Sequence, residues 1–128
     1  MKSSQINNEK DFQRIFSKVI KHLWGWIYKI PDVGRNQKPF DNFIAYKWNI
    51  KAVELKVAPT NKTNVLRLLK DHQVSNLMSL YPNGYVACYF KKEKATSLYQ
   101  MQTNWSLKEV LHLKKLLEVC GYLLWKDS

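Results

Sequence analysis

Residues 40–57 read FDNFIAYKWNIKAVELKV, and the placement of apolar side chains in this stretch decides the fold. The pattern predicts one strand over about 40–47 and a second over 50–57, joined as a hairpin. Two charged residues, Glu54 and Lys56, interrupt the second strand. Because alternate residues of a strand share a face, we expect these side chains to lie about 6.6 Å apart on one side of the sheet.

Outside this hairpin, helical and strand patterns follow one another without an internal repeat or a linker. The segment 50–90 predicts a strand-helix-strand crossover, which is right-handed and pairs its two strands in parallel. The expected fold is therefore one α/β domain over residues 1–128, a mixed β-sheet flanked by helices. The other expected elements are helices over 8–23, 63–80 and 106–121, the last beginning with a capping box at Ser106–Glu109 and ending at Gly121, and strands over 24–30, 85–90 and 97–101.

The composition limits the partners of this domain. Its 128 residues include 21 Lys+Arg and 10 Asp+Glu, a formal net charge of +11. Such an excess attracts polyanions, and nucleic acid is the most common of them. An anionic membrane surface is the alternative, but the sequence has neither a separate basic amphipathic helix nor an apolar run of about 18 residues. The start of the chain lacks the apolar segment of a secretory signal, and Cys88 and Cys120 lie in apolar contexts, so we expect a cytoplasmic protein with buried free thiols.

The charged residues of the hairpin fit metal-dependent phosphodiester hydrolysis. Charges in an apolar strand are unfavourable unless they have ligands. We expect Asp41 and Glu54 to bind Mg²⁺ or Mn²⁺, helped by the carbonyl of Leu55. Lys56 would then orient or activate the attacking water. Asp32 is the alternative first acid, but it falls in the connection before the strand, so Asp41 is preferred.

Two further polar residues are candidates for the same site. Glu9, at the start of the first predicted helix, is in line to complete a second metal site. Its alternative role is to stabilise the helix dipole, and Asp11 is a less favoured substitute. Gln73 is the one polar residue on the apolar line of the second predicted helix. This position suggests a hydrogen bond between Gln73 and Lys56, or between Gln73 and a water on the metal.

Basic residues near these positions are candidates for DNA contacts. Arg14 lies on the first predicted helix, and Arg35 and Lys38 flank the approach to Asp41. His72 is either a phosphate contact or an ordinary surface histidine. Phosphate contacts by such residues would be independent of base sequence and sensitive to salt. For each lysine and arginine, a solvated surface charge is the alternative.

The order of these residues resembles the PD-(D/E)xK nuclease superfamily, and within it the RecU-type Holliday-junction resolvases. The resemblance rests on Asp41-x12-Glu54-x-Lys56, on Asn61-Lys62-Thr63 and on Asp71-His72-Gln73, and it covers about residues 40–90. It implies a restriction-endonuclease-like fold and a Mg²⁺- or Mn²⁺-dependent endonuclease that works as a homodimer and cuts branched DNA symmetrically. It also implies that Asp41 and Glu54 are metal ligands, that Lys56 is the catalytic lysine, and that the first helix supplies an acid, for which Glu9 is the best match.

Two features depart from the resolvase pattern. The long stalk that precedes the aspartate in that family is reduced here to residues 31–39, and the Arg-Gly-rich entry to the first helix is missing. These departures concern junction specificity rather than nuclease chemistry. A restriction-type or nicking nuclease of the same fold and a non-catalytic nucleic-acid-binding module are therefore the alternatives. The size fits a compact protein encoded by a bacterium, a phage or a mobile element.

Overall fold

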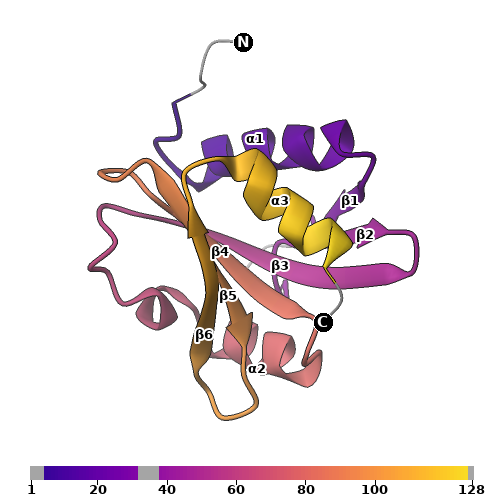
Figure 1. Ribbon diagram of the computed structural model, residues 1–128. Helices are drawn as coiled ribbons and strands as arrows, with labels where there is room; N and C mark the ends of the chain where they lie inside the picture. The colour runs from indigo at the N-terminus through magenta and orange to yellow at the C-terminus, as the bar shows by residue number, and fades with distance from the viewer. Residues whose placement is uncertain (1–4, 32–37, 127–128) are drawn as a thin grey trace.

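The computed structural model describes residues 5–31 and 38–126, which form a six-stranded mixed sheet with helices on both faces (Figure 1). The strands lie in chain order, and β3 and β4 pair in parallel whereas the other neighbours are antiparallel. The predicted α/β class is confirmed. The elements are α1 (Glu9–His22), β1 (Trp26–Lys29), β2 (Asn42–Tyr46), β3 (Asn49–Ala58), the 3₁₀ helix η1 (Val65–Leu68), α2 (Asp71–Ser79), β4 (Gly84–Phe90), β5 (Ala95–Met101), β6 (Leu107–Leu113) and α3 (Leu116–Trp125).

The predicted hairpin and crossover are both present. β2 and β3 pair antiparallel, with Asn42 opposite Val53, and Lys47 in the turn has a φ of 55°. The parallel pair β3–β4 is connected through η1 and α2. Gly84 is needed at the start of β4, because a Cβ there would overlap with the carbonyl oxygen of Leu77 in α2. This close approach sets α2 directly against the sheet.

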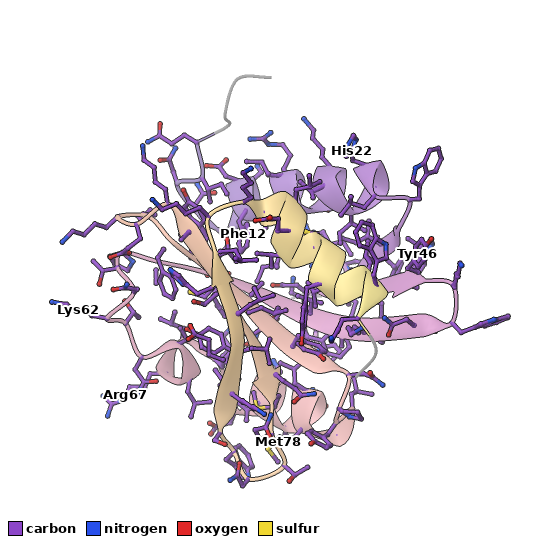
Figure 2. The ribbon with its side chains drawn as sticks, in the orientation of Figure 1. Phe12, His22, Tyr46, Lys62, Arg67 and Met78 are labelled. Atoms are coloured by element: carbon purple, nitrogen blue, oxygen red, sulfur yellow. The ribbon has the colours of Figure 1, made fainter. Side chains whose placement is uncertain are left out.

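Two apolar clusters fill the space between the sheet and its helices. α1 and α3 lie side by side over one face, and α2 packs on the other (Figure 1). Figure 2 shows Phe12 directed into the molecule, whereas Lys62 and Arg67 point outward. The first cluster includes Phe12, Phe16, Ile20, Ile44, Val53, Leu55 and Leu123, and the second includes Phe40, Ala52, Val74, Leu77, Val86 and Phe90.

The first predicted helix is confirmed, and its N-cap is Asn8. The side-chain oxygen of Asn8 accepts a hydrogen bond from the backbone N–H of Asp11 at 2.8 Å. The carboxylate of Asp11 accepts one from the backbone N–H of Asn7 at 3.0 Å. Asp11 therefore belongs to the cap at the start of α1. Glu9 remains the candidate acid of the site.

The predicted single helix over 63–80 is wrong, because the segment is divided into η1 and α2. Leu69 and Lys70 between them are extended, with ψ angles of 142° and 153°. The backbone N–H of Lys70 donates to Oε1 of Gln73 at 3.0 Å, so the side chain of Gln73 starts a new helix. On the apolar line expected for this helix, Leu69, Gln73 and Leu77 are buried.

The predicted last helix over 106–121 is also wrong. Residues 107–113 form the edge strand β6, and α3 begins only at Leu116. Gly121, expected to end the helix, is a buried residue inside α3. A Cβ at Gly121 would lie 3.1 Å from the ring of Trp125, so this glycine lets the indole lie close to the helix backbone.

A β-bulge in β6 explains the wrong assignment. Leu98 of β5 lies opposite Leu111, but the next residue, Tyr99, lies opposite Glu109, which leaves Val110 as an additional residue. A bulge breaks the strict alternation that identifies a strand in a sequence. The remaining apolar spacing then resembles that of a helix.

Two smaller expectations concern the cysteines and membranes. Cys88 and Cys120 are buried and free, as expected. Within residues 5–31 and 38–126, no helix is both long enough and apolar enough to span a bilayer.

Candidate active site

The predicted charged residues meet where β3 extends past the start of β2. From Glu54 onward, β3 is paired with β4 but no longer with β2. Asp41, directly before β2, fills this gap, since its Oδ2 accepts a hydrogen bond from the backbone N–H of Leu55 at 2.8 Å. The N–H and C=O of a strand residue point to the same side. The carbonyl of Leu55 therefore faces the same opening as Asp41.

Glu54 and Lys56 lie on the face of the sheet that α2 covers. The Glu54 side chain is 1% exposed and that of Lys56 is 10% exposed. Lys56 Nζ lies 3.4 Å from Glu54 Oε2, and Nε2 of Gln73 donates to the same oxygen at 3.2 Å. The other oxygen of Glu54, Oε1, has no hydrogen-bond partner among the described residues. A buried carboxylate oxygen in this state needs a ligand or a proton.

The protonation of Glu54 reflects this environment. Burial, followed by the negative charge of Asp41, raises the pKa of Glu54 to about 8, and the attraction of Lys56 opposes this rise. The two neighbouring carboxylates repel each other when both are ionised. A divalent cation between them would remove that repulsion and satisfy the unpartnered oxygen.

The donor set fits a hard cation such as Mg²⁺ or Mn²⁺. Such ions take oxygen ligands from carboxylates, carbonyls and water. Asp41 and Glu54 supply carboxylate oxygens to one cavity, and the carbonyl of Leu55 is a further oxygen on the side of β3 that Asp41 covers. In the described part of the chain, no group of three His, Cys, Asp or Glu side chains is arranged so that all three could hold one metal ion. A cation here would therefore complete its coordination with water.

Glu9 reaches the site from α1. Its carboxylate lies 4.0 Å from Lys56 Nζ, and its side chain is 53% exposed. Burial is the largest influence on the pKa of Glu9 and raises it, while Lys56 opposes the rise. Glu9 is therefore a more peripheral member of the site than Glu54.

A pair of amides holds α1 in this position. Gln13, one helical turn after Glu9, exchanges two hydrogen bonds of 2.9 Å with the buried side chain of Asn42. Asn42 directly follows Asp41, so the pair fixes the start of α1 to the start of β2. Sequence reasoning missed this contact. Its only signal was an amide on the edge of an apolar helix face and another inside an apolar strand.

The site opens into a basic cavity of about 680 Å³. Lys38 Nζ lies 3.0 Å from Oδ1 of Asp41, and Nε2 of His72 is 3.1 Å from the carbonyl oxygen of Lys38. Arg14 also lines the cavity, whereas Arg35 and Asp32 lie outside the described residues. Lys10 of α1 lines the cavity as well, and two further lining lysines, Lys29 and Lys70, were not predicted. The lining residues are Glu9, Lys10, Gln13, Arg14, Lys29, Lys38, Asp41, Glu54, Lys56, Lys70, His72 and Gln73.

The predicted catalytic and metal-binding side chains are thus brought together by α1, α2, β3 and the residue before β2. Glu9, Asp41, Glu54, Lys56 and Gln73 come from distant parts of the chain and share one cavity. Comparisons of the chain with protein-family models, with curated proteins and with solved structures gave no match.

Proposed function

We propose that this chain is a metal-dependent DNA endonuclease with a restriction-endonuclease-like core, and that it acts on branched DNA such as a four-way junction. The observation that carries the proposal is the environment of Glu54. This carboxylate is buried, has one unpartnered oxygen, and lies beside Asp41 and Lys56. Strongly perturbed acids that share a cavity with charged partners are typical of catalytic sites.

The energetics of the cluster favour a catalytic role over a structural one. Apolar residues of similar volume often stabilise a protein more than a buried ion pair does. The pair Glu54–Lys56 occupies a strand whose other inward positions, such as Ala52 and Ala58, are apolar. A charged pair retained at this place is explained by a ligand that needs it.

The residues would share the work of hydrolysis as follows. Asp41, Glu54 and the carbonyl of Leu55 would hold the cation, which neutralises charge on the scissile phosphate and lowers the pKa of a water when bound. The ammonium group of Lys56 would hydrogen-bond the phosphate and orient the attacking water. Gln73 would keep Oε2 of Glu54 in place and leave Oε1 free for ligation.

The charge of the cavity supports DNA as the substrate. Arg14, Lys10, Lys29 and Lys70 line its walls around the carboxylates. A formal net charge of +11 strengthens the attraction of the whole molecule for a polyanion. Symmetric cutting of two strands needs two active sites, so the proposal includes a homodimer.

Cleavage of labelled DNA tests this proposal. The substrates are a four-way junction, a flap, a nicked duplex and a plain duplex, each with Mg²⁺, with Mn²⁺ or with EDTA. Lys56→Ala and Glu54→Gln are compared with Lys108→Ala, a matched change of an exposed lysine on β6.

We expect metal-dependent, symmetric cuts at the junction that both site variants abolish and Lys108→Ala retains. Equal cutting of all substrates would support nuclease activity and contradict the proposed preference for junctions. DNA binding without metal-dependent cutting would contradict the enzymatic proposal and leave a nucleic-acid-binding module.

A further inference from the structure

Two aromatic side chains on the edge strand β1 form an exposed stack. The rings of Trp26 and Tyr28 are nearly parallel, with an interplanar angle of 7° and centroids 6.1 Å apart. Trp26 is 56% exposed and Tyr28 is 48% exposed. Neither residue belongs to the two apolar clusters that stabilise the sheet. Core packing therefore does not account for the pair.

The stack lies on the same face of the sheet as the candidate active site. Tyr28 is opposite Phe43 in β2, and Phe43 is opposite Ala52 in β3. Directly opposite residues of an antiparallel pair share a face, as do alternate residues of one strand. Glu54 follows Ala52 by two residues and so lies one row beyond Tyr28, a step of about 6.6 Å along the strands.

A basic residue of the same strand lines the cavity. Lys29 directly follows Tyr28, so it projects from the opposite face of β1, and its side chain lines the cavity that contains Asp41 and Glu54. A phosphate bound in this cavity would therefore lie within a few nucleotides of the two rings. Positive charge beside exposed aromatic rings is the combination that proteins use to bind single-stranded nucleic acid.

We propose that Trp26 and Tyr28 form a stacking platform for unpaired nucleobases, so that the DNA in the cavity carries non-duplex nucleotides next to the scissile phosphate. The inference rests on the proposed function for the role of the cavity. Every base has a π-face that stacks on an exposed aromatic ring, largely independently of sequence. In a duplex these faces are covered by the neighbouring base pairs, so the platform selects for unpaired nucleotides.

A protein interface is the alternative use of these residues, and it needs more area than the two rings supply. Complete burial of two aromatic side chains removes about 300–500 Å² of surface, whereas a standard interface buries about 800 Å² on each partner. Ile50, 54% exposed, lies in the row of Trp26 through Ala45, and two still more exposed residues, Trp24 before β1 and Trp48 between β2 and β3, lie beyond the strand ends. A change at Ile50 therefore separates the two interpretations, because it would disturb a protein interface and keep both rings.

Binding measured in EDTA tests the platform without any cleavage. The ligands are a single-stranded oligothymidylate that contains 2-aminopurine and a blunt duplex of the same length. The double variant Trp26→Ala/Tyr28→Ala is compared with Trp26→Phe/Tyr28→Phe, which keeps two rings, with Ile50→Lys, and with Trp105→Ala. Trp105 is an exposed residue between β5 and β6, which lie at the opposite edge of the sheet from β1. Circular dichroism and sedimentation confirm folding and association state.

We expect the double alanine variant to bind the single strand about tenfold or more weakly and to lose the quenching of 2-aminopurine fluorescence. Its affinity for the blunt duplex should stay within about twofold of the unsubstituted chain, since phosphate contacts are unchanged. The phenylalanine pair, Ile50→Lys and Trp105→Ala should retain single-strand binding.

Three results would overturn the platform: no loss on the single strand, an equal loss on both ligands, or an effect that Ile50→Lys reproduces through a changed association state. The outcome is separable from that of the nuclease proposal. If the unsubstituted chain cuts no DNA but the double alanine variant loses base stacking, the platform stands and the nuclease proposal is wrong. If the unsubstituted chain cuts DNA but the double alanine variant binds the single strand as well as it does, the nuclease stands and the platform is wrong.

Discussion

The carboxylate of Asp41 accepts a hydrogen bond from the backbone N–H of Leu55, with 2.8 Å between Oδ2 and the nitrogen. This bond covers the edge of β3 at the point where β2 no longer pairs with it. The other oxygen of Asp41, Oδ1, lies 3.0 Å from Lys38 Nζ. Asp41 therefore has a structural role through one oxygen and an electrostatic role through its charge, and substitution can separate the two.

Asp41→Asn and Asp41→Ala should differ in stability and agree in metal binding. The amide of asparagine keeps an acceptor for the N–H of Leu55 but loses the charge that a cation needs. We expect Asp41→Asn to unfold near the temperature of the unsubstituted chain, and Asp41→Ala to be about 1–2 kcal/mol less stable. Both should bind Mn²⁺ at least about tenfold more weakly in calorimetric titrations. An asparagine variant with undiminished Mn²⁺ affinity would show that Asp41 is not a ligand.

Glu54 should make the metal-free protein less stable as the pH rises. Burial and the nearby charge of Asp41 raise the pKa of Glu54 from 4.5 to about 8. Between these values the folded state binds more protons than the unfolded state, so the free energy of unfolding falls with increasing pH. Glu54→Gln cannot ionise and should escape this loss. Urea denaturation should find the variant about 1–3 kcal/mol more stable than the unsubstituted chain at pH 8.5, with a much smaller difference at pH 5.

The same proton should be linked to metal binding. A cation needs the ionised form of Glu54, so its binding displaces the proton that the carboxyl holds below pH 8. We expect the affinity for Mn²⁺ to rise between pH 6 and pH 8, with proton release visible as a buffer-dependent heat in calorimetry. Affinity that is independent of pH over this range would contradict Glu54 as a ligand.

Gln73 should tune Glu54 as well as start α2. Its Oε1 accepts from the backbone N–H of Lys70, and its Nε2 donates to Glu54. Gln73→Glu keeps the acceptor but adds another acid beside Glu54, so the pH dependence of cleavage should move to higher pH. Gln73→Leu loses both hydrogen bonds and should be about 1–3 kcal/mol less stable. An unshifted pH profile for Gln73→Glu would show that the contact with Glu54 has no catalytic consequence.

DNA affinity should fall steeply as the salt concentration rises, and basic residues of the cavity wall should account for part of this dependence. Each neutralised phosphate changes the slope of log K against log salt concentration by about 0.9 on duplex DNA. Arg14→Ala should therefore reduce the slope by about one if Arg14 contacts a phosphate, equally for all base sequences. Lys108→Ala, on β6, should leave it unchanged. Equal slopes for the two variants would place the bound DNA away from the cavity.

Much of the fold was predictable because local patterns and tertiary packing agree. The hairpin of β2 and β3 and the apolar face of α1 have strong periodicity, and both occur as predicted. Prediction failed where a local irregularity changed the period. The bulge at Val110 gives β6 a helix-like spacing, and the side chain of Gln73 divides one predicted helix into η1 and α2.

The candidate site was predictable to the extent that its residues are close in sequence. Asp41, Glu54 and Lys56 share one hairpin, so strand geometry alone brings them together. The amide pair of Gln13 and Asn42 joins residues 29 positions apart, and such pairing depends on how α1 docks. The stack of Trp26 and Tyr28 was equally hidden, because sequence alone does not distinguish an exposed aromatic residue from a buried one.

Single-turnover cleavage of a labelled four-way junction by the unsubstituted chain and by Lys56→Ala tests whether the cavity around Glu54 and Lys56 hydrolyses DNA. Lys56 Nζ lies 3.4 Å from Glu54 Oε2, and its removal leaves Asp41 and Glu54 in the chain. We expect the unsubstituted chain to cut the junction in Mg²⁺ or Mn²⁺ but not in EDTA. The rate for Lys56→Ala should be at least about 100-fold lower, with junction binding retained. An unchanged rate in Lys56→Ala would show that Lys56 is not catalytic, and no metal-dependent cutting by the unsubstituted chain would show that the protein is not this nuclease.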